Sequence, residues 1–158
     1  MWITASELAE RLTRASAGQL HASDPQSSTA IIDVRDDDFE GGNIVGCKNV
    51  PSRIYRDSVK GVVRDVEQYP LVVFHCQLSQ SRGPTAARLY IDERVSQLEA
   101  GKLKPLREPR ESDDEIGKCI EGGQEIRILR GGFSSFGEQY KANPKLVENW
   151  DQESQDYR

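Results

Sequence analysis

The chain has 158 residues, of which 36% are hydrophobic and 30% charged, and its formal net charge is −5. This length predicts one domain, large enough to bury a hydrophobic core without disulfide bonds. The acidic excess argues against nucleic acid as a partner, because general nucleic-acid binding needs a basic surface. The longest hydrophobic run, Leu71–Phe74, is far too short to cross a bilayer, so no membrane partner is expected.

Cysteine usage bears on the compartment. The three cysteines, Cys47, Cys76 and Cys119, are an odd number at wide spacings, which is not the pattern of a disulfide framework. With two histidines, they also give no zinc-binding spacing, so no metal is expected. No basic segment followed by a hydrophobic one begins the chain, so no signal peptide is visible. We therefore expect a reducing compartment, the cytoplasm, with the nucleus as a further location.

The first predicted elements lie before residue 36. Residues 4–7 (TASE) have the form of a capping box, in which a threonine hydroxyl and a glutamate carboxylate satisfy amides of the first helical turn. The helix that follows should end before residue 17. Residues 21–29 are a loop by composition, and residues 30–35 (AIIDVR) predict a short buried strand.

The middle of the chain alternates between strands and helices. A turn rich in Asp and Gly, residues 36–43, precedes a second predicted strand over residues 45–50. Pro51 ends that strand, and a helix is expected from Ser52 towards Tyr69. Residues 71–75 (LVVFH) are the clearest strand, and residues 83–84 (GP) introduce a long helix, because proline suits a first helical turn.

The last third contains an insertion. Residues 101–124 hold two prolines, charges of both signs and no sustained periodicity, which predicts a surface insertion that is partly disordered or only locally helical. A strand over residues 125–129 follows, and residues 131–132 (GG) open a final amphipathic stretch. The alternation favours one α/β domain over residues 1–150, with a parallel sheet between helices, and a polar tail over residues 151–158.

The residues that bear chemistry are concentrated after the clearest strand. Cys76 directly follows this strand and Arg82 begins the next helix, at the edge of a parallel sheet where ligands bind. A helix N-terminus offers unpaired amides and a positive dipole end, which favour an anion and a cysteine thiolate. Arg82 can hold a tetrahedral oxyanion through two parallel hydrogen bonds. We therefore predict Cys76 as the nucleophile and Arg82 as the oxyanion clamp.

The seven residues from Cys76 to Arg82 form a loop wide enough for phosphate or arsenate. Between its ends, backbone amides are expected to bind the oxyanion, and the residues concerned are Gln77, Leu78, Ser79, Gln80 and Ser81. The hydroxyl of Ser79 has two interpretations. It donates a hydrogen bond to the departing thiolate, or it braces the loop.

Residues outside the loop are expected to support it. His75 is interpreted as a structural residue that bonds backbone near the loop and tunes the thiolate, rather than as a general base. Asp33 is expected to fix the loop or Arg35. The run Asp36–Asp38 is interpreted as a solvated turn, with a source of catalytic acid as the alternative.

These segments resemble the M-phase-inducer (cell-division-cycle) phosphatases. The resemblance lies in LVVFHC, HCQLSQSRGP and TAARLY, and it is greater to the small single-domain relatives in fungi and plants, some of which are arsenate reductases. AIIDVRDDDFEGGNIVGCKNVP and IRILRGGFSSF also resemble family segments, with Asn43 in place of a usual His. The resemblance implies a rhodanese-like three-layer domain with a central, mainly parallel five-stranded sheet flanked by helices. Ordinary rhodanese sulfurtransferases have a loop one residue shorter, so sulfur transfer is disfavoured.

The resemblance also implies a mechanism that needs no cofactor. Cys76 attacks phosphorus to form a phosphocysteine, Arg82 and the loop amides hold the equatorial oxygens, and water hydrolyses the intermediate. The substrate would be a phosphorylated protein or a small oxyanion. With arsenate, the thiol adduct would instead pass to glutathione or a glutaredoxin and be reduced.

Two departures from the family pattern matter. Cell-cycle members carry glutamates in the loop where this chain has Gln77 and Ser81, so no loop carboxylate can protonate a leaving alcohol. The acid then comes from elsewhere or from the substrate, which moves the interpretation somewhat towards arsenate. The family's Asp-Cys-Arg strand here has Val34 in the middle, so its protective disulfide is unavailable at the usual place. Cys47 as a substitute partner is left open.

Three functions follow as hypotheses. The first is a tyrosine or dual-specificity phosphatase, the second is an arsenate reductase on the same cysteine, and the third is a non-catalytic module that binds phosphate in an intact loop. The sequence leaves the oligomeric state and the physiological substrate open.

Overall fold

The structure is a computed structural model, and it describes residues 1–16 and 29–158. A central sheet has the strand order β1-β7-β5-β2-β4, with parallel pairing along this whole path, and β6 pairs antiparallel to β7. A two-stranded antiparallel sheet lies beside it. The central strands are β1 (Trp2–Ile3), β2 (Thr29–Asp33), β4 (Lys48–Asn49), β5 (Leu71–His75), β6 (Ile120–Glu121) and β7 (Gln124–Leu129), and the small sheet pairs β3 (Asn43–Ile44) with β8 (Val147–Glu148).

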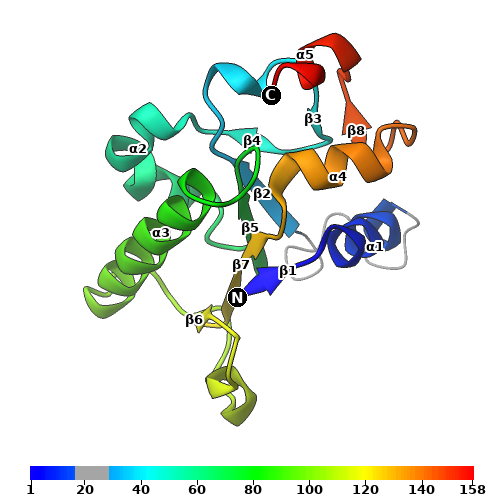
Figure 1. The fold of residues 1–158 in the computed structure, drawn as a ribbon. Helices are drawn as coiled ribbons and strands as arrows, with labels where there is room; N and C mark the ends of the chain where they lie inside the picture. The colour runs from blue at the N-terminus through cyan, green and yellow to red at the C-terminus, as the bar shows by residue number, and fades with distance from the viewer. Residues whose placement is uncertain (17–28) are drawn as a thin grey trace.

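Helices cover both faces of the sheet. α2 and α3 pack on one face and α1 and α4 on the other, which gives three layers (Figure 1). The helices are α1 (Ala5–Ser16), α2 (Ser52–Asp65), α3 (Arg82–Glu99), α4 (Gly132–Tyr140) and α5 (Gln152–Asp156), with 3₁₀ turns η2 (Asp37–Phe39) and η3 (Glu111–Asp114). This confirms the predicted α/β architecture. The sheet has six strands instead of five, because the end of the insertion returns as β6.

Strand β5 separates two hydrophobic cores. Val72 and Phe74 pack with α2 and α3, whereas Leu71 and Val73 pack with α1 and α4. Alternate residues of a strand point to opposite faces, so a continuous hydrophobic run suits a strand that is covered on both sides. All five residues of β5 are buried, and the strand is thereby a rigid support for the loop that follows it.

The capping box at the first helix is confirmed. The Glu7 amide donates to Thr4 Oγ1 (3.2 Å), and the Thr4 amide donates to Glu7 Oε2 (3.3 Å). Helix α1 ends at Ser16, as expected. The loop predicted over residues 21–29 lies outside the described residues except for Thr29, which begins β2.

Two predicted elements have different bounds. The strand expected over residues 45–50 is replaced by β3 and β4, because Gly46 (φ +81°) turns the chain and sends the two strands to different sheets. Helix α2 ends at Asp65 and not near Tyr69. The buried Gln124 side chain donates to the carbonyl oxygens of Val66 (2.9 Å) and Tyr69 (2.8 Å), which holds this segment outside the helix.

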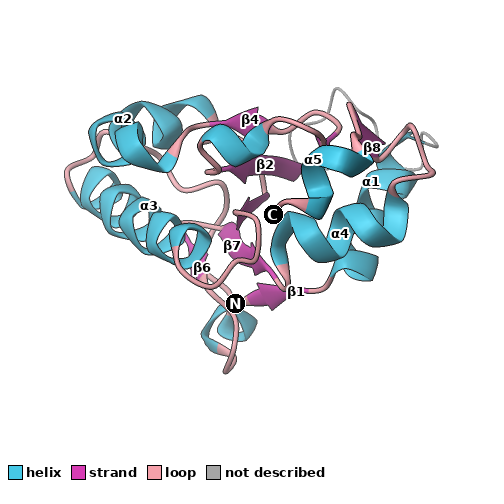
Figure 2. Ribbon diagram, turned by 45° about the horizontal axis from the view of Figure 1, so that its top comes forward, coloured by secondary structure: helices cyan, strands magenta, loops and turns pink. Residues whose placement is uncertain are grey.

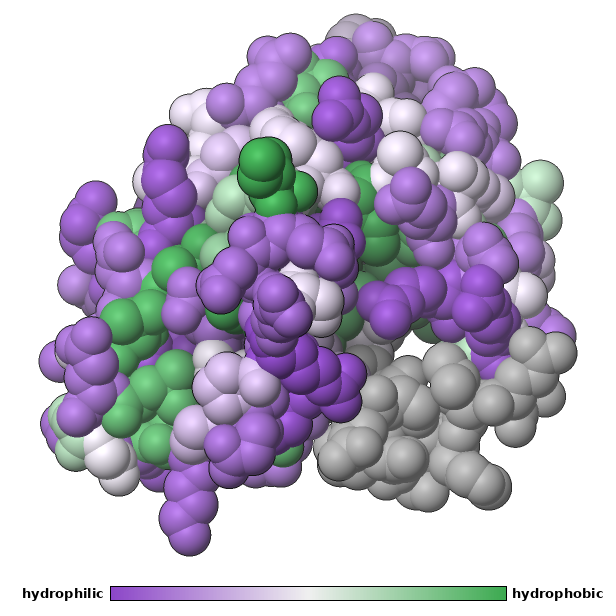
Figure 3. All heavy atoms as spheres, turned by 90° about the horizontal axis from the view of Figure 1, so that it is seen from below, coloured by the Kyte–Doolittle hydropathy of each residue, from purple (hydrophilic) through white to green (hydrophobic). Residues whose placement is uncertain are grey.

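The insertion extends away from the end of the sheet (Figure 1). It is locally ordered by η3 and by an ion pair between Arg107 and Asp113 (2.7 Å). The glycines at residues 122–123 both have positive φ and form the hairpin into β7. Seen from the end of the molecule with the insertion, the surface is mostly hydrophilic, with scattered hydrophobic groups (Figure 3). Within the described residues, no helix combines the length and hydrophobicity that crossing a membrane requires.

Candidate active site

The loop between β5 and α3 lies at the carboxyl end of the central strands (Figure 2). Its first residue, Cys76, is 3% exposed, and Cys76 Sγ accepts a hydrogen bond from the Gly83 amide (3.4 Å) in the first turn of α3. A Cβ at residue 83 would lie 3.3 Å from the backbone of His75 and Cys76, so glycine allows this close approach. The thiol therefore sits at a helix N-terminus, where the backbone amides and the helix dipole favour a bound anion.

The loop amides are available to a ligand. The amides of residues 77–82 donate to no other group in the part of the chain that the structure describes. Ser79 has a φ of +54°, and its buried Oγ likewise has no hydrogen-bond partner there. Successive amides without partners, in a turn that includes a left-handed residue, suit an anion-binding nest. The structure thus brings together Cys76, the predicted loop residues and the start of α3.

The N-terminus of α4 fixes the start of the loop. The Phe133 amide donates to the Cys76 carbonyl oxygen (3.0 Å), and the Ser134 amide donates to that of Gln77 (2.9 Å). Gly132 has a φ of +61°, and a Cβ there would lie 2.5 Å from the Gln77 carbonyl oxygen. Gly132 is therefore in close contact with the loop.

Arg35 links the loop to the adjacent turn. It forms a fully buried ion pair with Asp33 (2.7 Å), and its guanidinium lies 4.2 Å from the ring centroid of Phe133. Its terminal nitrogens also donate to Gln77 Oε1 (3.2 Å) and to the Gly42 carbonyl oxygen (2.8 Å). Of the two partners expected for Asp33, the loop or Arg35, it contacts Arg35, and the supporting role of this pair stays a prediction. Gln77 has its side chain held here, so only its amide remains for an anion.

His75 is fully buried beside the loop. Its Nδ1–H donates to the Cys76 carbonyl oxygen (3.0 Å), and its Nε2 lies 3.6 Å from Asp33 Oδ2, too far for a hydrogen bond. Burial lowers the pKa of His75 below its ordinary value of 6.5 and outweighs the attraction of Asp33. A neutral imidazole bonded to backbone agrees with the structural interpretation.

The acidic run is not simply a solvated turn. Arg82 Nη2 lies 2.6 Å from Asp38 Oδ2 and Arg82 Nη1 lies 2.9 Å from Asp38 Oδ1, while Asp36 Oδ2 is 3.3 Å from Nη1. Only Asp37 has a fully exposed side chain. The solvated interpretation is therefore wrong for Asp36 and Asp38, because η2 curls the turn towards the start of α3.

These contacts set the protonation of the carboxylates. Burial alone would raise the pKa of Asp38, but hydrogen bonds from Arg82 and its positive charge outweigh burial and lower it. Burial likewise opposes a lowered pKa at Asp36, where hydrogen bonds from Ser52, the Arg53 amide and Arg82 prevail. The same pairing with Asp38 raises the pKa of Arg82. Both carboxylates are therefore ionised at neutral pH and are poor proton donors in this state.

A hollow of about 240 Å³ opens beside the cysteine. It is lined by Cys76, Gln77, Leu78, Gln80, Ser81, Arg82, Ser134 and Arg158. The last of these comes from the C-terminal segment, where α5 packs near the loop: Gln77 Nε2 donates to Gln155 Oε1 (3.4 Å). Sequence reasoning missed this contribution. The available signal was Asp151, which caps α5 by accepting from the Glu153 amide (3.2 Å).

Neither Cys47 nor Cys119 lines the hollow. Cys47 packs with the α1 and α4 core, whereas Cys76 packs with the α2 and α3 core on the other side of the sheet. Burial raises the pKa of the Cys47 thiol to about 12. This arrangement disfavours Cys47 as a disulfide partner. The described residues contain no cluster of His, Cys, Asp or Glu that could hold a metal ion.

Comparison with known proteins finds phosphatases and arsenate reductases as relatives. No model of a protein family matches the chain. Dual specificity phosphatase ibp1 of Schizosaccharomyces pombe is 34% identical over 119 residues, which are 75% of this chain and 82% of that protein. Arsenate reductase 2.1 of Oryza sativa subsp. japonica is 35% identical over 92 residues, 56% of each protein. The solved structure of Ygr203w, described as a yeast protein tyrosine phosphatase of the rhodanese family, matches with a TM-score of 0.66 at 18% identity, over 96% of this chain and 94% of that one. This match shows the rhodanese fold.

Proposed function

Because the chain belongs to the Cdc25-like family of single-domain phosphatases with rhodanese fold and arsenate reductase relatives, we propose that it is a cysteine-dependent phosphatase of the tyrosine or dual-specificity type. The observation that carries the proposal is the position of Cys76 Sγ at the N-terminus of α3, beside Arg82 and among loop amides that have no other partner within the described residues. A nucleophile, an anion nest and a cation in one hollow suit phosphoryl transfer.

The proposed reaction has two displacements at phosphorus. The Cys76 thiolate forms a sulfur–phosphorus bond as the bond to the leaving oxygen breaks, and the leaving alkoxide or phenoxide takes a proton from solvent. Water then attacks phosphorus, the sulfur–phosphorus bond breaks, and inorganic phosphate and the thiolate are released. Loop amides and Arg82 bind the three equatorial oxygens throughout.

Acid assistance is the weak part of this site. The loop contains no carboxylate, and the nearest ones, Asp36 and Asp38, have lowered pKa values because of their hydrogen bonds with Ser52 and Arg82. Leaving groups that need no proton should therefore react fastest. We expect aryl phosphates and phosphotyrosine to be better substrates than phosphoserine.

The decisive test is hydrolysis of an aryl phosphate by the wild type and Cys76→Ser. The variant should lose at least about 10³-fold in kcat/KM, since the serine hydroxyl is a poor nucleophile without a base. Cys47→Ser, at a partly buried position on the other side of the sheet, is the matched control and should retain activity. An equal rate for the wild type and Cys76→Ser would refute the proposal.

Arsenate reduction on the same cysteine is the second candidate. It is supported by the missing acid, because arsenate carries acidic hydroxyl groups that can supply the proton with which its oxygen leaves as water when the thiolate–arsenic bond forms, and by the similarity to a rice arsenate reductase. Glutathione or a glutaredoxin would supply the two electrons. Arsenate-dependent oxidation of NADPH, coupled through glutathione, glutaredoxin and glutathione reductase, should then depend on Cys76. If the protein binds phosphate but neither hydrolyses aryl phosphate nor reduces arsenate, the third hypothesis, a non-catalytic module that binds phosphate, would remain.

A further inference from the structure

The guanidinium of Arg82 is held by the turn at residues 36–38. Asp38 accepts one hydrogen bond from each terminal nitrogen, at 2.9 and 2.6 Å, and Asp36 accepts a further one from Nη1 at 3.3 Å. The Arg82 and Asp38 side chains are 33% and 20% exposed, so water screens this pair less than it would a surface pair.

These contacts leave one edge of the guanidinium available. A guanidinium carries five N–H donors in a planar fork. Asp38 takes the donors at the tip, and Asp36 takes the other donor of Nη1. The Nε donor and the second donor of Nη2 remain, on the same edge, with no partner in the described residues. Two parallel donors on one edge are what two oxygens of a phosphate or arsenate require.

The turn that holds Arg82 is itself anchored. The Asp36 amide donates to Asp38 Oδ1 (2.9 Å), and the buried Arg35 donates to the Asp38 carbonyl oxygen (3.2 Å). Asp36 also accepts from Ser52 Oγ and from the Arg53 amide (3.2 Å) at the start of α2. The carboxylates of Asp36 and Asp38 are therefore held in place as acceptors for Arg82. Their turn is connected through Arg35 to the buried ion pair with Asp33.

We propose that Asp38 is a positioning residue for Arg82, which fixes the tip of the guanidinium so that its Nε–Nη2 edge is held ready for the oxyanion bound in the loop. The proposal rests on the proposed function only in taking the loop as an oxyanion site. An unsupported arginine would lose side-chain entropy when it bound the anion, whereas the pair with Asp38 removes that freedom during folding. The cost of the arrangement is a negative charge near an anion site.

The test compares Asp38→Asn with Asp37→Asn. Both remove one negative charge from the same turn, but the Asp37 side chain is fully exposed and its ion-pair partner is Arg53. Asp38→Asn should lower kcat/KM for an aryl phosphate about 10- to 100-fold, and Asp37→Asn should change it less than about twofold. Asp38→Glu, which keeps the charge, should recover part of the loss.

A second readout measures oxyanion binding without turnover. Inorganic phosphate or arsenate bound in the loop should protect Cys76 from alkylation by iodoacetamide. The concentration for half-protection should rise about tenfold or more in Asp38→Asn and stay unchanged in Asp37→Asn. Tighter protection in Asp38→Asn would instead make Asp38 a competitor of the oxyanion and overturn the proposal.

A double-mutant cycle with Arg82→Lys shows whether Asp38 acts through Arg82. Lysine lacks the planar guanidinium that Asp38 is proposed to orient. Adding Asp38→Asn to Arg82→Lys should therefore lower activity and oxyanion binding little further. Additive losses would mean that Asp38 acts independently, for example as a proton donor, and would contradict the proposal. Thermal unfolding of each variant separates these effects from loss of fold.

The outcomes distinguish this proposal from the proposed function. If the wild type does not turn over phosphate esters but phosphate protects Cys76, and Asp38→Asn weakens that protection, the positioning role stands while the phosphatase fails. If the wild type is active and Asp38→Asn behaves as Asp37→Asn does, the positioning role fails alone. If no oxyanion protects Cys76 in the wild type, both fail.

Discussion

At the scale of single residues, His75 shows how a side chain beside the proposed nucleophile is kept in one protonation state. It is fully buried between Asp33 and Phe133, with one ring nitrogen bonded to the Cys76 carbonyl oxygen. Burial lowers its pKa more than the nearby carboxylate raises it, and Arg35 lowers it further. The neutral ring fixes the first carbonyl of the loop without adding a positive charge to a dry site.

This burial predicts a dependence of stability on pH. Below about pH 6.5 the unfolded chain binds a proton at His75 that the folded chain does not bind, so the free energy of unfolding should fall as the pH decreases through that value. His75→Asn keeps an amide donor near the position of Nδ1 but has no group that titrates in this range. In this variant the free energy of unfolding should therefore fall less as the pH decreases. Urea unfolding from about pH 8 to about pH 5 would measure it. Identical slopes in the two proteins would show that His75 does not contribute.

At the scale of elements, the loop is placed by the N-termini of two helices. The first turn of α3 contacts Cys76 Sγ, and the first turn of α4 donates to the carbonyl oxygens at residues 76 and 77. Glycine favours both contacts: a Cβ at residue 83 would lie tightly against the backbone at 3.3 Å, and residue 132 has a positive φ and would place a Cβ 2.5 Å from a carbonyl oxygen. Helix α4 thus contacts the candidate active site although it carries no predicted catalytic residue.

A pair of glycine substitutions tests this role of α4. Gly132→Ala would place a Cβ 2.5 Å from a backbone carbonyl oxygen at a positive φ, and should lower the free energy of unfolding by more than about 2 kcal/mol. Gly61→Ala, on the exposed side of α2 with no atom near its added Cβ, should raise it by about 0.5–1 kcal/mol. Chemical denaturation measures both changes. A Gly132→Ala protein as stable as the wild type would contradict the assigned contact.

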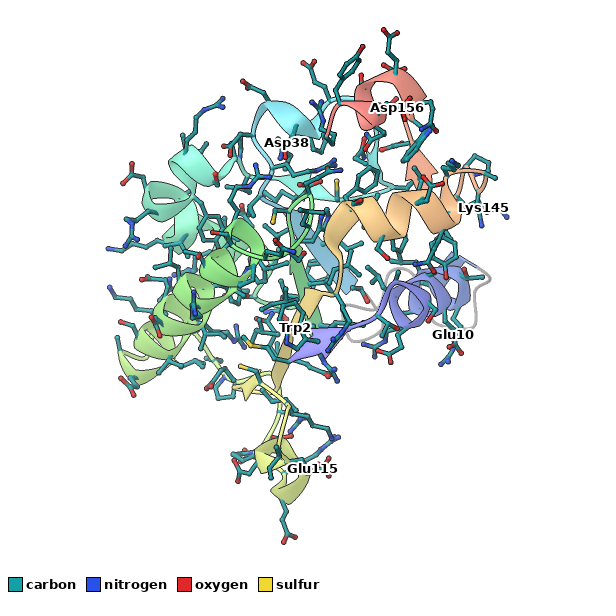
Figure 4. All side chains as sticks on the ribbon, in the orientation of Figure 1. Trp2, Glu10, Asp38, Glu115, Lys145 and Asp156 are labelled. Carbon is teal, nitrogen blue, oxygen red and sulfur yellow. The ribbon has the colours of Figure 1, made fainter. Side chains whose placement is uncertain are left out.

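At the scale of the whole molecule, segments far apart in the sequence meet around one hollow. Asp38 and Asp156 lie at the same end of the molecule, and Glu115 of the insertion lies at the opposite end (Figure 4). Arg158 lines the hollow with Cys76 and donates to the Glu40 carbonyl oxygen (3.1 Å). The C-terminal segment therefore adds a cation at the mouth of a site that also contains two carboxylates.

This cation should contribute to binding of an anionic substrate. Arg158→Ala is expected to raise KM for an aryl phosphate about two- to tenfold with little change in kcat, because the charge acts at the mouth and not on the transferred group. The effect should shrink at high ionic strength. Lys145→Ala removes the same charge at an exposed position away from Asp38 (Figure 4) and is the control. Equal KM values for the two variants would contradict this role.

The sequence by itself determined the parts that depend on local pattern. The hydrophobic run of β5, the glycine and proline after Arg82 and the seven-residue spacing from Cys76 predicted the strand, the helix start and the anion loop, because these features need only neighbours in the chain. The capping box of α1 was predictable for the same reason. The resemblance that these motifs carry also indicated the fold and the family.

Only the tertiary structure decided what surrounds the loop. Arg82 pairs with a carboxylate 44 positions away, and Gln155 of the polar tail bonds to Gly41, 114 positions away. Neither contact leaves a periodic signal, because polar side chains on turns and short helices follow no hydrophobic pattern. The partner of the guanidinium is fixed by where the turn at residues 36–38 packs against α2 and the buried Arg35, and that is a property of the folded chain.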